Sequence, residues 1–108
     1  ELIRILIPQG VCSHRIDLRD HLGGKLNDLR FREAICESNF FAKSGFYTNR
    51  IQMHSMLNIF QKAGFMVQLG EVRKWNSLPI DHRHLAPQFR ELPESALNIS
   101  GFDVILRK

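Results

Sequence analysis

The sequence predicts an α/β fold, in which helices and strands follow one another along the chain. Three segments carry this prediction. A helical end passes through a Pro-Gly turn into a strand near the N-terminus, an amphipathic helix runs into a strand at 53–69, and a β-branched strand occupies 101–107. Such an arrangement places the strands in one sheet with helices packed on it.

The composition is that of one ordinary globular domain. The 108 residues are 44% hydrophobic and 24% charged, which suffices for one modest core. The formal net charge of +4 is spread out, because Arg15 and Arg19 alternate with Asp17 and Asp20. A nucleic-acid-binding surface needs a stripe of one sign, so we do not expect nucleic acid as the partner.

Membrane insertion and disulfide bonding are not expected either. No apolar run approaches the ~20 residues that cross a bilayer, and no signal peptide opens the chain. Cys12 and Cys36 are the only cysteines, and their spacing fits no C-x-x-C motif. Isolated cysteines of this kind predict reduced thiols and a cytoplasmic protein.

The first segment reads as the end of a helix, a turn and a strand. Residues 1–6 are mostly apolar and have no capping residue before them. Pro8 ends the helix because it lacks an N–H, and Gly10 at the last position favours a type I turn that tolerates Gln9. A strand is expected at 11–18.

The middle of the chain contains the clearest helix. Residues 23–47 are irregular, allow one or two helices, and form the most aromatic stretch, which we interpret as core or as a substrate pocket. A helix then begins at Thr48 or Asn49, with Gln52 in capping-box position, and Gly64 ends it. Its apolar stripe has helical spacing, and a strand follows it. The stripe is Met53, Met56, Leu57 and Phe60, and the strand is marked by Phe65, Val67 and Leu69.

The remaining third is a connection and a final strand. Residues 76–100 contain three prolines and predict short helical turns. The β-branched run at 101–107 predicts the last strand.

Three segments in this order resemble class I S-adenosylmethionine-dependent methyltransferases. Arg4-Ile5-Leu6-Ile7-Pro8-Gln9-Gly10 is similar to the R-x-L-x-P-G-G turn before the fifth strand of that family, with Gln9 in place of a glycine. Residues 57–67, which contain Ala63-Gly64-Phe65, are similar to its last helix and sixth strand, and residues 101–108 to its seventh. His14-x-Ile16-Asp17-x-x-Asp20-His21 and residues 44–50 resemble a bacterial subgroup that methylates small molecules.

The resemblance implies that this chain is one partial domain. It would supply strands five, six and seven of a Rossmann-like sheet ordered 3-2-1-4-5-7-6, with an antiparallel final strand. The family's Gly-rich cofactor loop is missing, because Gly23-Gly24 follows the wrong strand. S-adenosylmethionine would therefore bind only the intact protein, through a half upstream of Glu1, and residues 22–47 would be an acceptor-side insertion.

Candidate catalytic residues cluster after the first strand. Ligands of open α/β sheets bind beyond the carboxyl ends of the parallel strands, where His14, Asp17, Asp20 and His21 are expected. Methyl transfer requires alignment and removal of a proton from the nucleophile, and an imidazole beside a carboxylate suits that step. The alternative is structural: a buried, hydrogen-bonded His14 and an Asp20 that caps a turn.

Candidate substrate-binding residues open the central helix. Tyr47, Asn49 and Arg50 are either simple capping residues or a clamp for a small-molecule methyl acceptor. A cation at a helix start opposes the helix dipole, and this favours a function for Arg50. His82 and His84 add to the possible metal ligands, but the spacing of the set is not that of a metal site, so no metal is predicted.

Two further functions compete with a methyltransferase part that is inactive alone. One is a small basic interaction or RNA-contacting α/β module, and the other is a metal-dependent hydrolase fragment. The methyltransferase interpretation also predicts that the strand at 11–18 is central in a larger sheet. The isolated chain would then expose its edge, together with apolar surface on Val11, Ile16 and Leu18, and self-associate.

Overall fold

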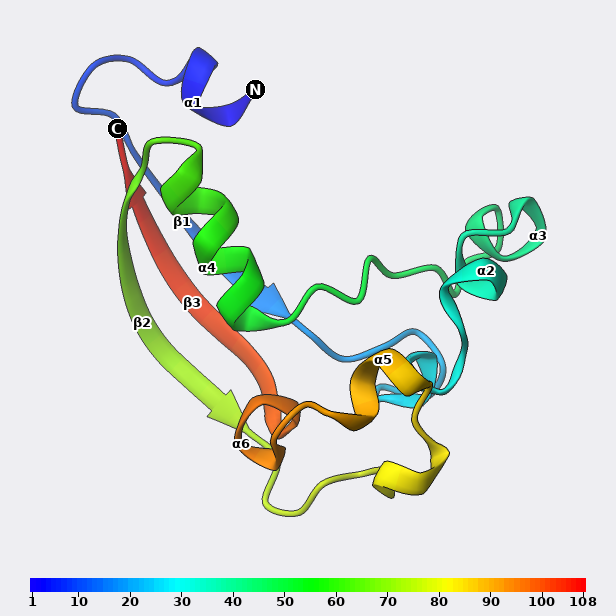
Figure 1. Cartoon of the computed structure of the whole chain (residues 1–108). Helices are drawn as coiled ribbons and strands as arrows, with labels where there is room; N and C mark the ends of the chain where they lie inside the picture. Colours follow the sequence, from blue (N-terminus) through cyan, green and yellow to red (C-terminus); the bar gives the residue numbers. More distant parts are fainter.

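The computed structural model describes residues 1–108 as an α/β chain with one three-stranded sheet (Figure 1). The strand order is β1-β3-β2, and β3 pairs antiparallel with both neighbours. β1 and β2 therefore run in the same direction, and the antiparallel final strand is confirmed. The strands are β1 (Val11–Asp17), β2 (Met66–Lys74) and β3 (Ile99–Arg107), and the helices are α1 (Leu2–Ile5), α2 (Glu33–Cys36), α3 (Asn39–Ala42), α4 (Met53–Lys62), α5 (Pro87–Arg90) and α6 (Glu94–Leu97).

One face of the sheet carries the main core. Phe102, Val104 and Leu106 of β3 are fully buried, and α4 lies along this face (Figure 1). The apolar stripe of α4 packs on the three side chains as its spacing predicts, and α1 adds Leu2 and Ile3. Because burial of apolar surface stabilises by about 25 cal/mol per Å², this layer stabilises the packing of α4 on the sheet.

The other face of the sheet carries charge in place of a second apolar layer. Asp103 accepts hydrogen bonds from Arg73 at 2.9 Å and from Arg15 at 3.2 Å, so an ion-pair ladder crosses all three strands. These guanidiniums lower the pKa of the Asp103 carboxyl. Val11 and Met66 are exposed at the strand ends. No helix of this chain packs on this face.

A second apolar cluster joins the loops beyond the carboxyl ends of β1 and β2. Leu29, Leu85 and Leu97 are each 1% exposed and pack with Leu26 and Ile80. The cluster fixes the 3₁₀ turn at Asn27–Arg30 against the long connection before β3. In contrast, α2 and α3 project away from the sheet (Figure 1), and Phe40 is 89% exposed.

Two local predictions are wrong. α4 begins at Met53 with Gln52 as its N-cap, so Thr48 and Asn49 precede the helix by several residues. The turn before β1 closes through a 2.8 Å bond from Gly10 N to Ile7 O, but Gln9 has a φ of 62°. A positive φ at the third position defines a type II turn, not type I. Gly64 ends α4 with a φ of 103°, as predicted.

No helix of the chain is long and apolar enough to cross a membrane. Cys12 and Cys36 are both free thiols.

Candidate functional site

A hollow of about 160 Å³ lies at the carboxyl end of β1. Its walls come from the end of β1, the loop after it, the 3₁₀ turn and the segment before α4. Four of the seven predicted site residues line it, and three do not. Asp17, His21, Asn49 and Arg50 line the hollow, together with Asp28 and Thr48; His14, Asp20 and Tyr47 lie outside it.

Asp17 is engaged by a neighbouring cation. The Arg19 guanidinium donates to both carboxylate oxygens, at 2.9 Å to Oδ1 and 2.7 Å to Oδ2, and the Arg19 backbone N–H donates to Oδ1 at 2.9 Å. These bonds lower the pKa of Asp17. A carboxylate held in its charged form is a weak proton acceptor at neutral pH, so Asp17 is better suited to orienting Arg19.

Asp20 organises the loop that leaves β1. Its side chain is 5% exposed, and its two oxygens accept three backbone N–H groups. Oδ1 bonds Leu22 at 3.1 Å and Lys25 at 2.9 Å, and Oδ2 bonds Asp28 at 3.0 Å. This is the arrangement that the turn-capping alternative describes, and it uses three of the roughly four acceptor positions of the carboxylate.

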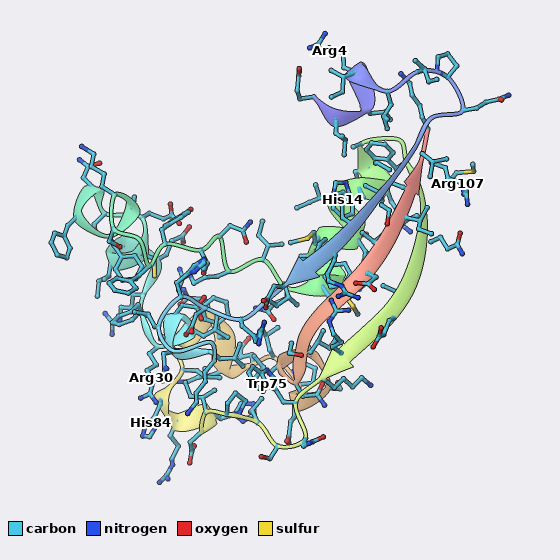
Figure 2. All side chains as sticks on the ribbon, turned by 180° about the vertical axis from the view of Figure 1, so that it is seen from behind. Arg4, His14, Arg30, Trp75, His84 and Arg107 are labelled. Carbon is cyan, nitrogen blue, oxygen red and sulfur yellow. The ribbon has the colours of Figure 1, made fainter.

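His21 and His14 lie in different environments. His21 is exposed, lines the hollow and makes no hydrogen bond to a carboxylate. His14 pairs with Val104 across the β1–β3 ladder, which places it on the sheet face covered by α4 (Figure 2). Its Nε2 is buried and has no hydrogen-bond partner. The sequence places both near the end of β1, but strand alternation directs His14 into the core.

Two of the three predicted substrate-binding residues, Tyr47 and Asn49, contact residues that are close to them in the sequence. The Tyr47 hydroxyl bonds the Glu37 carboxylate at 3.2 Å, and this contact raises the pKa of Tyr47. Asn49 Oδ1 accepts from Ile51 N at 3.1 Å in a short turn. Of the three, Tyr47 lies away from the hollow, beside the segment that carries α2.

Arg50 connects three separate parts of the fold. Its guanidinium donates to the carbonyl of Phe31 at 2.7 Å and lies 5.1 Å from the centre of the Phe89 ring. Its backbone has a φ of 55°, a strained value for a residue with a side chain. Because Arg50 stands before α4, opposition to that helix's dipole does not explain its placement.

Asp28 and Thr48 are site residues that the sequence reasoning missed. Asp28 is 3% exposed, and its Oδ2 accepts a hydrogen bond from the Thr48 hydroxyl at 2.7 Å. Burial is the main cause that raises the pKa of Asp28. The available signal was an aspartate between Leu26 and Leu29, a charge in an apolar setting. Its partner Thr48 is 20 residues away, so no local sequence pattern indicates the pair.

A second, wider hollow of about 440 Å³ lies at the carboxyl ends of β1 and β2. It is mostly basic, and Trp75 follows β2 at its edge (Figure 2). Asp17 and Arg19 line both hollows. The remaining lining residues are Arg15, Arg73, Lys74 and Ser100.

No group of three or more His, Cys, Asp or Glu side chains is arranged to hold a metal ion. His82 and His84, which extended the possible ligand set, lie on a 3₁₀ turn in the connection before β3.

Comparison with family models, with curated proteins and with solved structures finds no match to this chain.

Proposed function

We propose that this chain is the acceptor-side part of an S-adenosylmethionine-dependent methyltransferase, inactive by itself. The strand order is the observation that carries the proposal. Strands that are consecutive in sequence usually lie side by side, but here the last strand lies between the first two and runs against both. If β1, β2 and β3 are the family's strands five, six and seven, the order β1-β3-β2 corresponds to the order 5-7-6 that ends the family's sheet.

Two further observations support this assignment. One edge of β1 is unpaired, because β1 is the outer strand beside β3, and in the proposal the family's fourth strand pairs there. The hollow opens beyond the carboxyl end of β1, the edge at which open α/β sheets bind ligands. A methyl acceptor held in this hollow would face a cofactor bound at the same edge.

In the proposal, the residues of this chain do not hold S-adenosylmethionine. Gly23 and Gly24 have positive φ values, but a Cβ added to either would meet no atom within 4 Å. Both glycines supply the positive φ values that the loop after β1 requires. Asp17, the acidic residue that ends β1, is already bonded to Arg19. The proposal accordingly assigns the cofactor contacts to strands outside this chain.

Within this proposal, each residue around the hollow has its own role in binding or in proton transfer. His21 is the accessible imidazole that takes a proton from the acceptor. Asp17 holds Arg19 at the rim, and Asp20 fixes the loop that presents His21. Asn49 and Arg50 line the hollow from the segment before α4, Tyr47 supports that segment through Glu37, and His14 lies outside the hollow, opposite Val104 of β3.

The test uses both the intact protein and the isolated chain. In the intact protein, transfer of a labelled methyl group from S-adenosylmethionine to small molecules of a cell extract is measured. A general base contributes ~10²–10⁴-fold in rate, so His21→Ala should lower turnover by at least the smaller factor and leave cofactor affinity unchanged. His84→Ala, on the 3₁₀ turn away from the hollow, is the matched control.

Calorimetry with the isolated chain tests whether the contacts to S-adenosylmethionine lie outside this chain. We expect no S-adenosylmethionine binding in the micromolar range. Micromolar binding would contradict the assignment of the cofactor to other strands, and normal turnover of His21→Ala would remove His21 from the mechanism.

The basic hollow favours a second candidate function, an RNA-contacting module. Arg15, Arg19, Arg73 and Lys74 surround it, with Trp75 beside them, and single-stranded nucleic acid binds surfaces that combine cations and aromatic rings. Fluorescence anisotropy with a labelled single-stranded RNA decides between the candidates. Binding that weakens steeply with salt, and is lost in Arg73→Ala, would favour the RNA module.

A further inference from the structure

The basic hollow at the carboxyl ends of β1 and β2 is lined almost entirely by hydrogen-bond donors. Asp17 is its only lining residue with a carboxylate, and that carboxylate is already bonded to Arg19. The donors come from all three strands and from the residues that follow them: Arg15, Arg19, Arg73, Lys74, Trp75 and Ser100. Such a set offers few acceptors to a cation and many donors to an anion.

The fold holds the Arg73 guanidinium across the central strand of the sheet. Its Nη1 donates to Asp103 at 2.9 Å, and its Nη2 donates to the carbonyl of Ile16 at 3.3 Å, so the group reaches from β2 over β3 to β1. Gly101 of β3 leaves room for it, because a Cβ there would lie 3.0 Å from Arg73 Nη2 and 2.7 Å from the Ile16 oxygen. A guanidinium has five N–H donors, so these two bonds leave others for a ligand. The direction of Arg73 is therefore fixed before any ligand binds.

The charges around the basic hollow do not balance. Two carboxylates pair with its three guanidiniums, Asp17 with Arg19 and Asp103 with both Arg15 and Arg73. The pKa of Arg15 is raised by Asp103 and, to a smaller degree, by Glu71, so Glu71 is a third neighbouring carboxylate. Lys74 takes part in no ion pair. Four cations against three carboxylates leave one positive charge, and it belongs to the exposed Lys74.

We propose that the basic hollow binds the phosphate group of a small organic phosphate monoester. Lys74 supplies the unpaired charge, and Arg73 supplies donors whose direction the sheet fixes. A phosphate has three terminal oxygens that accept strong hydrogen bonds, whereas a carboxylate has two in one plane, so donors that arrive from three strands match the phosphate. The smaller hollow serves the proposed function, and this inference stands without that function.

The size and surroundings of the basic hollow favour a small molecule over a nucleic acid. A volume of about 440 Å³ is roughly fifteen times the ~30 Å³ that one water molecule occupies in the liquid, enough for a phosphate and several carbons. Trp75 is the one hydrophobic lining residue, and its ring provides an apolar wall for those carbons. A surface that binds a polynucleotide is a stripe of one sign, but three carboxylates lie among these cations.

The test titrates the full 108-residue chain with n-propyl phosphate and follows the fluorescence of Trp75, the only tryptophan of the chain. We expect a saturable change in the millimolar range or below, with none for n-propanol or for potassium chloride at equal ionic strength. Lys74→Gln should weaken binding about tenfold, as loss of a charge-assisted hydrogen bond does. Lys62→Gln removes an equal charge from the last turn of α4, outside the hollow, and should bind normally.

A second variant keeps the inference open to refutation if Lys74→Gln does not fold. Arg15→Gln removes another cation of the hollow while Asp103 keeps its ion pair with Arg73, and it should also weaken binding of n-propyl phosphate. Equal affinity for butyrate, unchanged binding in the folded variants, or no saturable binding would each overturn the inference. A single-stranded RNA that binds where n-propyl phosphate does not would also overturn it, and would favour the RNA-contacting module.

Discussion

Replacing Asp20 with alanine should unfold the loop after β1, although the sequence marks this residue as catalytic. The substitution removes a buried carboxylate that accepts hydrogen bonds from Leu22, Lys25 and Asp28. Hydrogen bonds to a charged group contribute about 1.5–3 kcal/mol each. Because the three share one side chain and are not additive, we expect a loss of about 3–5 kcal/mol. Domains have about 0.05–0.15 kcal/mol of stability per residue, so this is a large fraction of the total.

Urea unfolding followed by circular dichroism measures the loss, and amide exchange at Leu22, Lys25 and Asp28 locates it. Asp81→Ala is the control, because Asp81 also accepts a backbone N–H, that of Arg83 at 2.9 Å, but on an exposed turn. Loss of such a cap costs about 0.5–2 kcal/mol. A loss for Asp20→Ala no larger than for the control, with unchanged exchange, would refute the structural role and return Asp20 to the catalytic candidates.

Three further predictions concern the turn, the buried acid and the sheet edge. Gln9→Gly should raise the free energy of unfolding by about 0.5–1 kcal/mol in urea titrations. Gln9 has a φ of 62°, which costs a residue with a side chain about 1–2 kcal/mol, and glycine removes this strain at an entropic cost of about 0.5–1 kcal/mol; an unchanged midpoint would refute the prediction. The raised pKa of Asp28 means that the folded chain binds the proton more tightly than the unfolded chain, so stability should fall as the pH rises from about 3.8 through that raised pKa. The difference in thermal midpoint between wild type and Asp28→Asn should show this slope, and parallel profiles would contradict it. The isolated chain should self-associate through the unpaired edge of β1, where Val11 is 49% exposed; sedimentation that gives a stable 12.6 kDa monomer would disprove this.

Part of the candidate site could be predicted because its signals are local. Asp17 and His21 follow a recognisable strand, and the carboxyl end of such a strand is a general location for ligands. The Asp28–Thr48 pair could not be found in this way, because its residues lie 20 positions apart and meet only when the 3₁₀ turn packs beside the segment before α4. His14 lies on a strand that the sequence predicts, but its environment could not be predicted, because only the register with Val104 decides which face of the sheet it occupies.

The sequence by itself determined the elements whose period or backbone chemistry is local. The stripe of α4 repeats every three to four residues, Gly64 supplies the positive φ that ends the helix, and β-branched residues mark β3. Only the tertiary structure decided the type II turn at Gln9, the face of the sheet that His14 occupies and the partners of Arg50. Propensity and periodicity act over a few residues, whereas pairing between distant segments depends on how the whole core packs.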